Sequence, residues 1–257
     1  MIKPYLQDRL HETLFGTHVS MTDSIASEIL GGAGFDFVWI DTEHSENSIT
    51  TVRQHLNAIQ GQGTAAIVRV TKNDPNHLKH ILELGVDGVV FPMINTAEEA
   101  QSAIMNCLYP PVGIRGCGPL RATRYGLDPM SDYIEFESRK ICKFVQIETV
   151  EAVKNLPSII ENPYIDGFFF GVFDLSGSIG KLSHIYCEEV QNLVKESISM
   201  LKKAGKPIGI STNCTDPEEN MNWYKMGINI ISSGCDFDYI FKGAIKNLDG
   251  LKKFIPR

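Results

Sequence analysis

Two acidic side chains stand where strands of an alternating α/β chain are expected to end. Glu148 closes the apolar run 143–148, and Asp174 follows the run 167–171. Adjacent parallel strands lie about 4.8 Å apart, so carboxylates at the ends of neighbouring strands can share one divalent cation. Such a site suits Mg²⁺, Mn²⁺ or Co²⁺ better than structural zinc. Either acid alone is more simply explained as a salt-bridge partner or a helix N-cap than as a metal ligand. The two acids together favour a metal site.

Arg69 lies in the middle of another apolar run, 65–70. A charge in such a run is costly to bury unless it is paired or binds a ligand. The guanidinium can hold a carboxylate or polarise a carbonyl through its planar set of donors. It can also serve as the counter-ion of Glu148 or Asp174, and the two roles are compatible.

His44 follows a third predicted strand, and Asp41 precedes it by three residues. We expect the Asp41 carboxylate to hydrogen-bond one ring nitrogen of His44, leaving the other free for proton transfer. The adjacent Glu43 is expected to face away, and we assign it no role.

Anion-binding groups are expected at two further places. The turn 171–174, which contains Phe173, can present consecutive backbone N–H groups to an anion. The segment 109–130 is rich in Pro, Gly and Arg and has no periodicity, and loops of this length in compact domains are usually functional or mobile. Its residues Arg115, Arg121 and Arg124 either contact a second negative end of a substrate or are ordinary surface charges.

The elements that must position these residues alternate between short apolar runs and helical stretches. Helix starts are marked by Asp74-Pro75, the capping box beginning at Thr96, Thr149 and Asp216-Pro217. Eight βα units in about 250 residues fit a single-domain (β/α)₈ TIM barrel over residues 1–257, with an open doubly wound sheet as the alternative. The predicted strands are Leu14–Val19, Phe35–Ile40, Ala65–Val70, Gly88–Pro92, Lys143–Glu148, Gly167–Gly171, Pro207–Ile210 and Ile228–Ser232.

The charge composition limits the kinds of macromolecule that the protein can bind. The chain has 257 residues, 31 acidic and 24 basic, for a formal net charge of −7. This charge and the lack of a long basic run argue against nucleic acid or an anionic membrane as a partner. The six scattered cysteines and the lack of a secretory signal predict a cytoplasmic protein with reduced thiols.

Five stretches resemble one known family. They are GFDFVWIDTEHS (34–45), VRVTKNDPNHLKHILELGVDGVVFPMINTAEEA (68–100), YPPVGIRG (109–116), VQIETVEAV (145–153) and DGFFFGVFDLSGSIG (166–180). In this order they are similar to the HpcH/HpaI aldolases, whose namesake is 2,4-dihydroxyhept-2-ene-1,7-dioate aldolase. Relatives act on 2-keto-3-deoxy sugar acids. Two positions depart from the family's usual pattern: Glu83 replaces Asp, and Phe173 replaces Ala.

The resemblance implies a (β/α)₈ barrel that performs metal-dependent, class II aldol cleavage of a 4-hydroxy-2-oxo acid to pyruvate and an aldehyde, without an organic cofactor. It implies the metal ligands Glu148 and Asp174, and Arg69 on the pyruvate carbonyl oxygen. It also implies Gln146 beside the metal and N–H groups around Phe173 on the pyruvate carboxylate.

The proton-transfer pair His44–Asp41 matches the family as well. The resemblance further implies hexamers, built as trimers of dimers, that exchange the C-terminal helix, here 236–254. Contacts to the aldehyde half are expected from the 109–130 loop and a neighbouring subunit.

Two other functions remain open at this point. A citrate-lyase-like or malyl-CoA-type lyase acting on an acyl-CoA predicts a basic groove for the CoA phosphates. A non-catalytic, ligand-binding barrel predicts that the metal-ligand positions are lost, whereas here they are filled.

Overall fold

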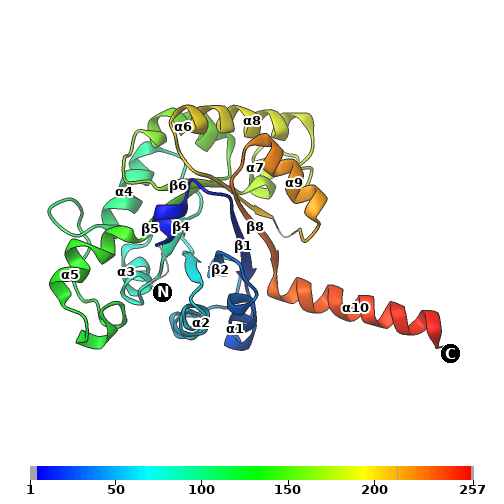
Figure 1. The fold of residues 1–257 in the computed structure, drawn as a ribbon. Coiled ribbons are helices and arrows are strands. Elements are labelled where there is room, and N and C mark those ends of the chain that lie inside the picture. Colours follow the sequence, from blue (N-terminus) through cyan, green and yellow to red (C-terminus); the bar gives the residue numbers. More distant parts are fainter. Residues whose placement is uncertain (1–4, 213, 256–257) are drawn as a thin grey trace.

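In residues 5–212 and 214–255, which the computed structural model describes, eight parallel strands close into one barrel with helices around it (Figure 1). The strands follow one another around the barrel in chain order, and β8 pairs back with β1. They are β1 (Leu14–Val19), β2 (Phe37–Asp41), β3 (Ala65–Arg69), β4 (Gly88–Phe91), β5 (Cys142–Ile147), β6 (Gly167–Phe170), β7 (Ile208–Thr212) and β8 (Ile230–Cys235). Closure confirms the predicted (β/α)₈ barrel over the open sheet.

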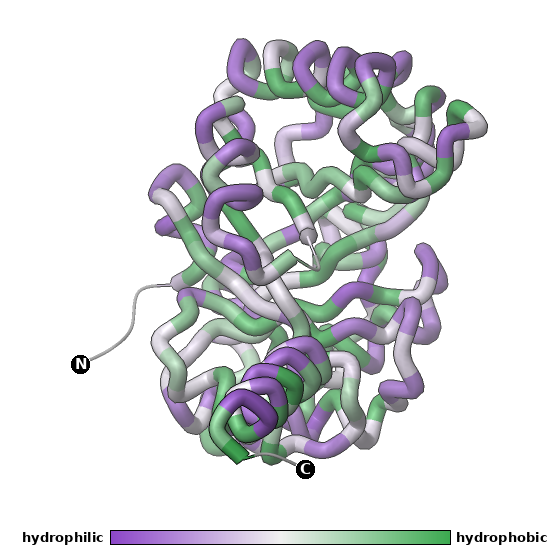
Figure 2. Tube along the Cα trace, turned by 90° about the vertical axis from the view of Figure 1, so that its right-hand side faces the viewer, coloured by the Kyte–Doolittle hydropathy of each residue, from purple (hydrophilic) through white to green (hydrophobic). Residues whose placement is uncertain are grey.

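The helices begin where the capping signals placed them. Asp74, Thr96, Thr149 and Asp216 each accept a backbone N–H of the first helical turn through their side chains. Hydrophobic residues concentrate on the strands, whereas the surrounding helices carry hydrophilic residues outward (Figure 2). The α-helices are α1 (Ser24–Gly32), α2 (Ile49–Gly61), α3 (Pro75–Glu83), α4 (Ala97–Cys107), α5 (Met130–Glu135), α6 (Val150–Ile160), α7 (Val172–Ser178), α8 (Glu188–Lys203), α9 (Pro217–Met226) and α10 (Asp236–Phe254).

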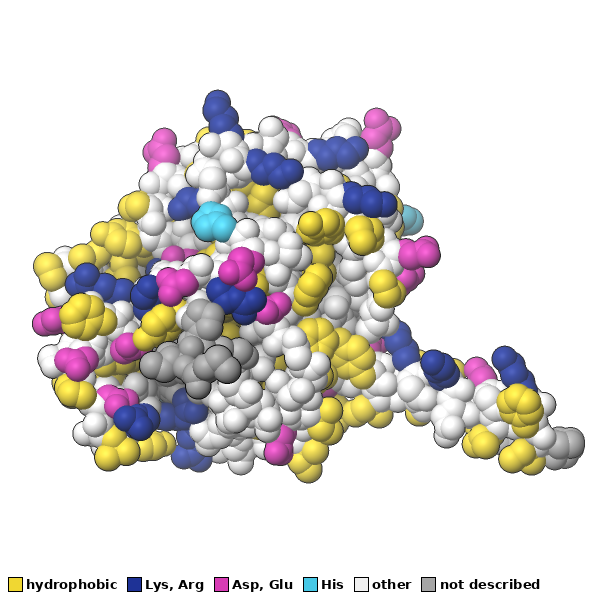
Figure 3. All heavy atoms as spheres, in the orientation of Figure 1, with side chains coloured by type: hydrophobic (Ala, Val, Ile, Leu, Met, Phe, Trp, Pro, Cys, Tyr) yellow, Lys and Arg dark blue, Asp and Glu magenta, His cyan; other side chains and the backbone are white. Residues whose placement is uncertain are grey.

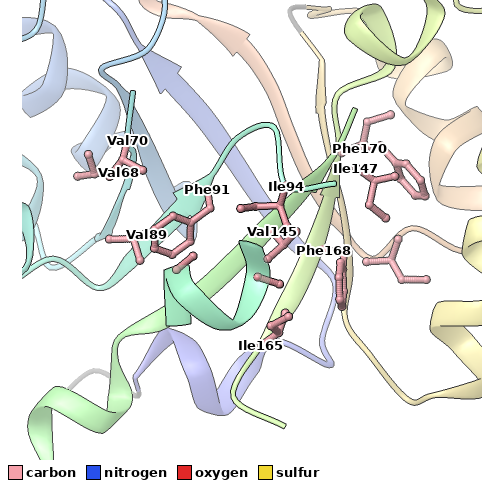
Figure 4. Packing of buried hydrophobic residues seen from close by; sticks show 14 of the residues in the cluster. Val68, Val70, Val89, Phe91, Ile94, Val145, Ile147, Ile165, Phe168 and Phe170 are labelled. Atoms are coloured by element: carbon pink, nitrogen blue, oxygen red, sulfur yellow. The ribbon is translucent and has the colours of Figure 1, made fainter. Parts of the chain in front are cut away.

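The core has two layers because the strands are buried on both faces, apart from the exposed Phe15 on β1. The larger layer fills the space between barrel and helices, and Figure 4 shows Phe91, Val145 and Phe168 within it. The smaller layer fills the barrel interior and includes Trp39 and Phe169. Glycines make room for the rings: a Cβ on Gly209 would lie 2.5 Å from the Phe169 ring.

The N-terminal end of the barrel is closed by a short 3₁₀ helix, η1 (Leu6–Arg9), whose Leu6 belongs to the interior core. The long connection from α4 to β5 lies at the same end. It contains η2 (Arg121–Gly126), α5 and η3 (Glu137–Lys140). Tyr5 beside η1 donates a 2.7 Å hydrogen bond to Glu137 of this connection.

Helix α10 leaves the barrel instead of packing on it (Figure 1). Of its described residues, only Asp236 is buried. Its apolar side chains are exposed, among them Phe241 at 62% and Phe254 at 85%, and Figure 3 shows them along the projecting helix. No described helix is both long and apolar enough to cross a membrane.

Candidate active site

The carboxyl ends of the strands surround a cavity of about 440 Å³. In a closed barrel the side chains at this end converge from all strands, as in TIM-barrel active sites. One side of the cavity, the charged arc, is formed by β2, β3, β5 and the start of α7, with Asp41, Arg69, Gln146, Glu148 and Asp174. The other side, the neutral arc, is formed by β7, β8, β1 and the start of α10, with Ser211, Cys235, His18, Ser20 and Phe237.

Glu148 follows β5 and is buried. Its Oε1 accepts a 2.9 Å hydrogen bond from Gln146 Nε2, and its Oε2 accepts a 2.8 Å bond from the backbone N–H of Met93. Gly171 gives this carboxylate its space, because a Cβ there would lie 2.5 Å from Oε1. Burial, together with the negative charges of two neighbouring carboxylates, raises the pKa of Glu148 to about 7.

Asp174 and Phe173 lie in the first turn of α7, directly after β6, and both side chains are exposed to the cavity. The N-cap Gly171 gives this helix no side-chain cap. The first N–H groups of a helix lack partners within the helix. The structure therefore brings Glu148 and Asp174 to one cavity, with backbone donors beside them.

Arg69 forms ion pairs with Asp41 and Glu43 and not with Glu148 or Asp174, the partners expected from the sequence. Its Nε and Nη2 bond the two oxygens of Asp41 at 2.9 and 2.8 Å. Its Nη1 lies 3.0 Å from Glu43 Oε2. Burial raises the pKa of Asp41, but the hydrogen bonds and charge of Arg69 outweigh it and hold that pKa below its usual value. Asp41 is thus the main partner of Arg69. Glu43, which was expected to face away, is a second carboxylate beside the same guanidinium.

His44 lines the cavity at its rim, with 64% of its side chain exposed. The acid near its ring is Glu43, whose Oε2 lies 3.8 Å from His44 Nε2. The expected Asp41–His44 hydrogen bond is therefore replaced by a looser approach of Glu43. The reason is strand register: Asp41 and Arg69 are direct partners in the β2–β3 ladder, so their side chains lie side by side.

The loop that carries His44 is held by a buried polar network that the sequence did not suggest. Ser27 Oγ lies 2.7 Å from His55 Nδ1, and His55 Nε2 lies 2.9 Å from Asn47 Oδ1. Asn47 Nδ2 in turn donates to the backbone oxygen of Asp41 at 3.1 Å. Burial lowers the pKa of His55, which favours the neutral ring that this network requires. The network fixes the loop against α1 and α2.

The neutral arc was also missed, because single polar residues inside apolar strands give no spacing signal. His18 on β1 is buried, and its Nε2 lies 3.0 Å from Ser211 Oγ on β7. Its Nδ1 lies 3.2 Å from the backbone oxygen of Gly234. A polar residue within β1, followed by Ser20 at its end, was the available hint.

The loop arginines do not reach this cavity. Arg115 is buried, with its guanidinium 4.5 Å from the centre of the Tyr109 ring and Nη2 3.2 Å from Tyr133 Oη. Arg121 donates to the backbone oxygen of Leu84 and to the side chains of α2, and Arg124 pairs with Asp128. Arg115, predicted as a substrate-binding residue, does not line this cavity, because a connection from a helix to the next strand lies at the N-terminal end of the barrel. Glu83 ends α3 at that same end, where a Cβ on Gly118 would lie 3.1 Å from it.

The charged arc fits a divalent cation. Glu148 and Asp174 offer carboxylate oxygens to one cavity, and the Oε1 of Gln146 is buried without a hydrogen-bond partner among the described residues. Negative charge exceeds positive charge here, which is part of why the pKa of Glu148 is raised. The described residues contain no group of three or more His, Cys, Asp or Glu arranged to hold a metal. Two protein carboxylates with water and substrate oxygens is a coordination that Mg²⁺ accepts.

Comparison with known proteins gives a consistent result. The family model described as HpcH/HpaI aldolase/citrate lyase matches residues 14–242. A 4-hydroxy-2-oxo-heptane-1,7-dioate aldolase of Klebsiella pneumoniae subsp. pneumoniae is 36% identical over 231 residues, 89% of this chain and 86% of the relative.

Solved structures agree in fold. An HpcH/HpaI aldolase/citrate lyase family protein from Burkholderia cenocepacia J2315 is 28% identical with a TM-score of 0.91, over 96% of this chain and 98% of that one. The citrate synthase SbnG is 25% identical with a TM-score of 0.86, over 97% and 98% of the two chains.

Proposed function

The chain belongs to the HpcH/HpaI aldolase/citrate lyase family and is a lyase of the class II aldolase type, and from this premise we propose that it cleaves a 4-hydroxy-2-oxo acid to pyruvate and an aldehyde. The observation that carries the proposal is the charged arc. Two carboxylates and an ion-paired arginine line one cavity at the catalytic end of the barrel. The 2-oxo acid half is common to this proposal and to the substrate in the Klebsiella relative's name.

The family generally depends on a divalent metal. In this chain Glu148 and Asp174 would hold the cation, with Gln146 beside it, and Mg²⁺, Mn²⁺ and Co²⁺ all suit such oxygen ligands. When bound, the cation supplies Lewis-acid stabilisation of the negative charge that develops as the carbon–carbon bond breaks. No organic cofactor is part of the proposal.

Arg69 is the residue that holds the carbonyl oxygen of the 2-oxo acid. Of the five N–H groups of a guanidinium, the hydrogen bonds to Asp41 use two, and Nη1 also forms an ion pair with Glu43. N–H groups that remain can donate to the substrate oxygen on which charge accumulates, and donors fixed in advance stabilise such charge without reorganisation. Asp41 and Glu43 act as positioning residues for Arg69. The substrate carboxylate would be bound by the N–H groups of Phe173 and Asp174.

His44 is the residue we propose for proton transfer. Its exposed ring at the cavity rim can accept the proton of the substrate's 4-hydroxyl, directly or through a water. The C3–C4 bond then breaks, the aldehyde leaves, and the bonding electrons pass to the 2-oxo group as an enolate. Protonation of the enolate at C3 gives pyruvate, so the protons and electrons balance.

The two alternative functions have less support. A lyase acting on an acyl-CoA needs cations for the CoA phosphates, but Arg69 is the one Lys or Arg among the described residues that line the cavity. A non-catalytic barrel has no need of the buried Glu148 with its raised pKa, or of the ion-paired Arg69 beside it.

We also propose that the enzyme is a homohexamer, a trimer of dimers, in which α10 packs on a neighbouring subunit. The exposed Phe15 of β1 borders an apolar hollow of about 450 Å³, together with Ile231 of β8 and with Met221 and Tyr224 of α9. The exposed apolar face of α10 is complementary to it in character. The six cysteines, all in the described part of the chain, are free, which supports the cytoplasmic location that we propose.

The test of the proposed function is pyruvate release from a panel of 2-keto-3-deoxy acids and 4-hydroxy-2-oxo dioates with Mg²⁺, Mn²⁺ or Co²⁺ in turn. At least one acid should release pyruvate, and Glu148→Ala should abolish that release while the protein stays folded. Full turnover by a folded Glu148→Ala variant would show that the site has been placed wrongly.

A further inference from the structure

The cavity divides by charge in a way that bears on the aldehyde half of the substrate. The charged arc belongs to β2, β3, β5 and α7, whereas the neutral arc belongs to β7, β8, β1 and α10. Because the strands follow one another in a closed ring, the two arcs face each other across the mouth. If the charged arc holds the 2-oxo acid half, as proposed above, the aldehyde half extends over the neutral arc.

His18 fixes the hydrogen-bonding character of this arc. Its Nδ1 faces the backbone oxygen of Gly234 at 3.2 Å, and a carbonyl oxygen can only accept, so Nδ1 carries the hydrogen. Nε2 is then an acceptor, and Ser211 Oγ must donate to it across 3.0 Å. The lone pairs of Ser211 Oγ remain for a ligand. Burial and the charge of Arg69 lower the pKa of His18 to about 4, so the ring supplies no positive charge at neutral pH.

Ser20 provides a second hydroxyl at a fixed position. Its backbone N–H bonds both carboxylate oxygens of Asp236 at 3.2 Å. The single hydrogen of the Cys235 thiol is directed to Asp236 Oδ1 at 2.9 Å, so Ser20 Oγ, 3.4 Å from Cys235 Sγ, donates its hydrogen to that sulfur and keeps its lone pairs for a ligand. The arc thus offers two hydroxyl oxygens, Ser211 Oγ and Ser20 Oγ, as acceptors for the hydroxyl hydrogens of a substrate.

A carboxylate on the aldehyde would find no cation on this arc. None of the described residues of the neutral arc is Lys or Arg. Lys242, farther along α10, donates to Thr215 Oγ1 at 3.0 Å and lies 3.8 Å from Asp238. The loop arginines lie at the other end of the barrel, as described above for Arg121.

We propose that the neutral arc is the aldehyde subsite and that it selects an uncharged, hydroxyl-bearing aldehyde over one that carries a carboxylate. Ser211 and Ser20 accept hydrogen bonds from the hydroxyl groups of the aldehyde, and His18 positions Ser211. This inference rests on the proposed function and adds the chemical class of the second product.

The test runs the reaction in the direction of synthesis, with metal-loaded enzyme, pyruvate and one of three aldehydes: glyceraldehyde, propanal or succinic semialdehyde. We expect a kcat/KM for glyceraldehyde about tenfold or more above that for succinic semialdehyde. Ser211→Ala should lower the glyceraldehyde value about three- to tenfold, the usual effect of one hydrogen bond, and the propanal value by less than twofold. Ser211→Thr, which keeps the hydroxyl, should restore the glyceraldehyde value. Ser131→Ala, an exposed serine on α5, is the matched control.

Two results would overturn the inference: equal or faster use of succinic semialdehyde, or an equal loss for glyceraldehyde and propanal in Ser211→Ala. Exchange of the pyruvate methyl protons in D₂O, followed by NMR, needs only the charged arc and separates the two levels of the account. Exchange with the wrong aldehyde preference refutes the subsite alone. No exchange and no adduct with any aldehyde refutes the proposed function and the subsite with it.

Discussion

Replacing Glu148 by Gln should remove the loss of stability that titration of this carboxyl group causes in the metal-free protein between pH 5 and pH 8. Burial and neighbouring charge raise the pKa of Glu148 from 4.5 to about 7 in the folded protein. A carboxyl group whose pKa is raised on folding stabilises the fold below its unfolded pKa, and this contribution is lost as pH rises through the folded pKa. Integrated over this range, the loss is about 2.5 kcal/mol, which is about 5–10 °C in Tm for a chain of this size.

The assay is thermal unfolding in EDTA at pH 5 and pH 8 for the wild type and for Glu148→Gln. Comparing the two differences cancels any hydrogen bond that Gln changes at both pH values. We expect the wild type to lose several degrees more than the variant on going to pH 8. Glu161→Gln, at the exposed C-terminal end of α6, is the matched control and should behave like the wild type. Equal pH dependence in wild type and Glu148→Gln would refute the electrostatic reasoning.

Three further predictions concern the metal, the arginine and the assembly. Mg²⁺ affinity measured by calorimetry should fall about tenfold from pH 8 to pH 6, because Glu148 must lose its proton to bind and its pKa is about 7; a pH-independent affinity would contradict this. Asp41→Asn breaks the two-point contact with Arg69, so kcat/KM for cleavage should fall about 100-fold or more, as for loss of a buried charge pair; a change below threefold would remove Asp41 from its positioning role. Phe241→Glu on the exposed face of α10 should yield smaller assemblies in analytical ultracentrifugation, whereas Lys246→Glu should not; an unchanged wild-type mass for Phe241→Glu would exclude this face from the interface.

The strands were predictable because a parallel sheet buried on both faces needs continuous apolar runs. The prediction for β1, Leu14–Val19, coincides with the observed strand. Helix ends are marked less clearly: α1 and α2 each end at a glycine, Gly32 and Gly61, but the positive φ angles fall two residues later, at Gly34 and Gly63. Local signals place an element but fix its last residue less well.

The position of a residue at the cavity was predictable where the residue stands at the end of a strand, as Glu148 and Arg69 do. The hydrogen-bond partner of Asp41 was not predictable. The spacing of Asp41 and His44 suggested a local contact between them, but the register of β2 and β3 places Asp41 beside Arg69. Arg115 lies away from the cavity because topology sends helix-to-strand connections to the opposite end of a barrel, which the composition of the loop does not indicate.

Metal dependence is tested by pyruvate release from the purified enzyme before and after its metal is removed by chelation, with the best substrate of the panel. We expect that release stops on chelation and returns when Mg²⁺, Mn²⁺ or Co²⁺ is added to the wild type, but not when it is added to Glu148→Ala. Undiminished release from the metal-free enzyme would contradict this expectation.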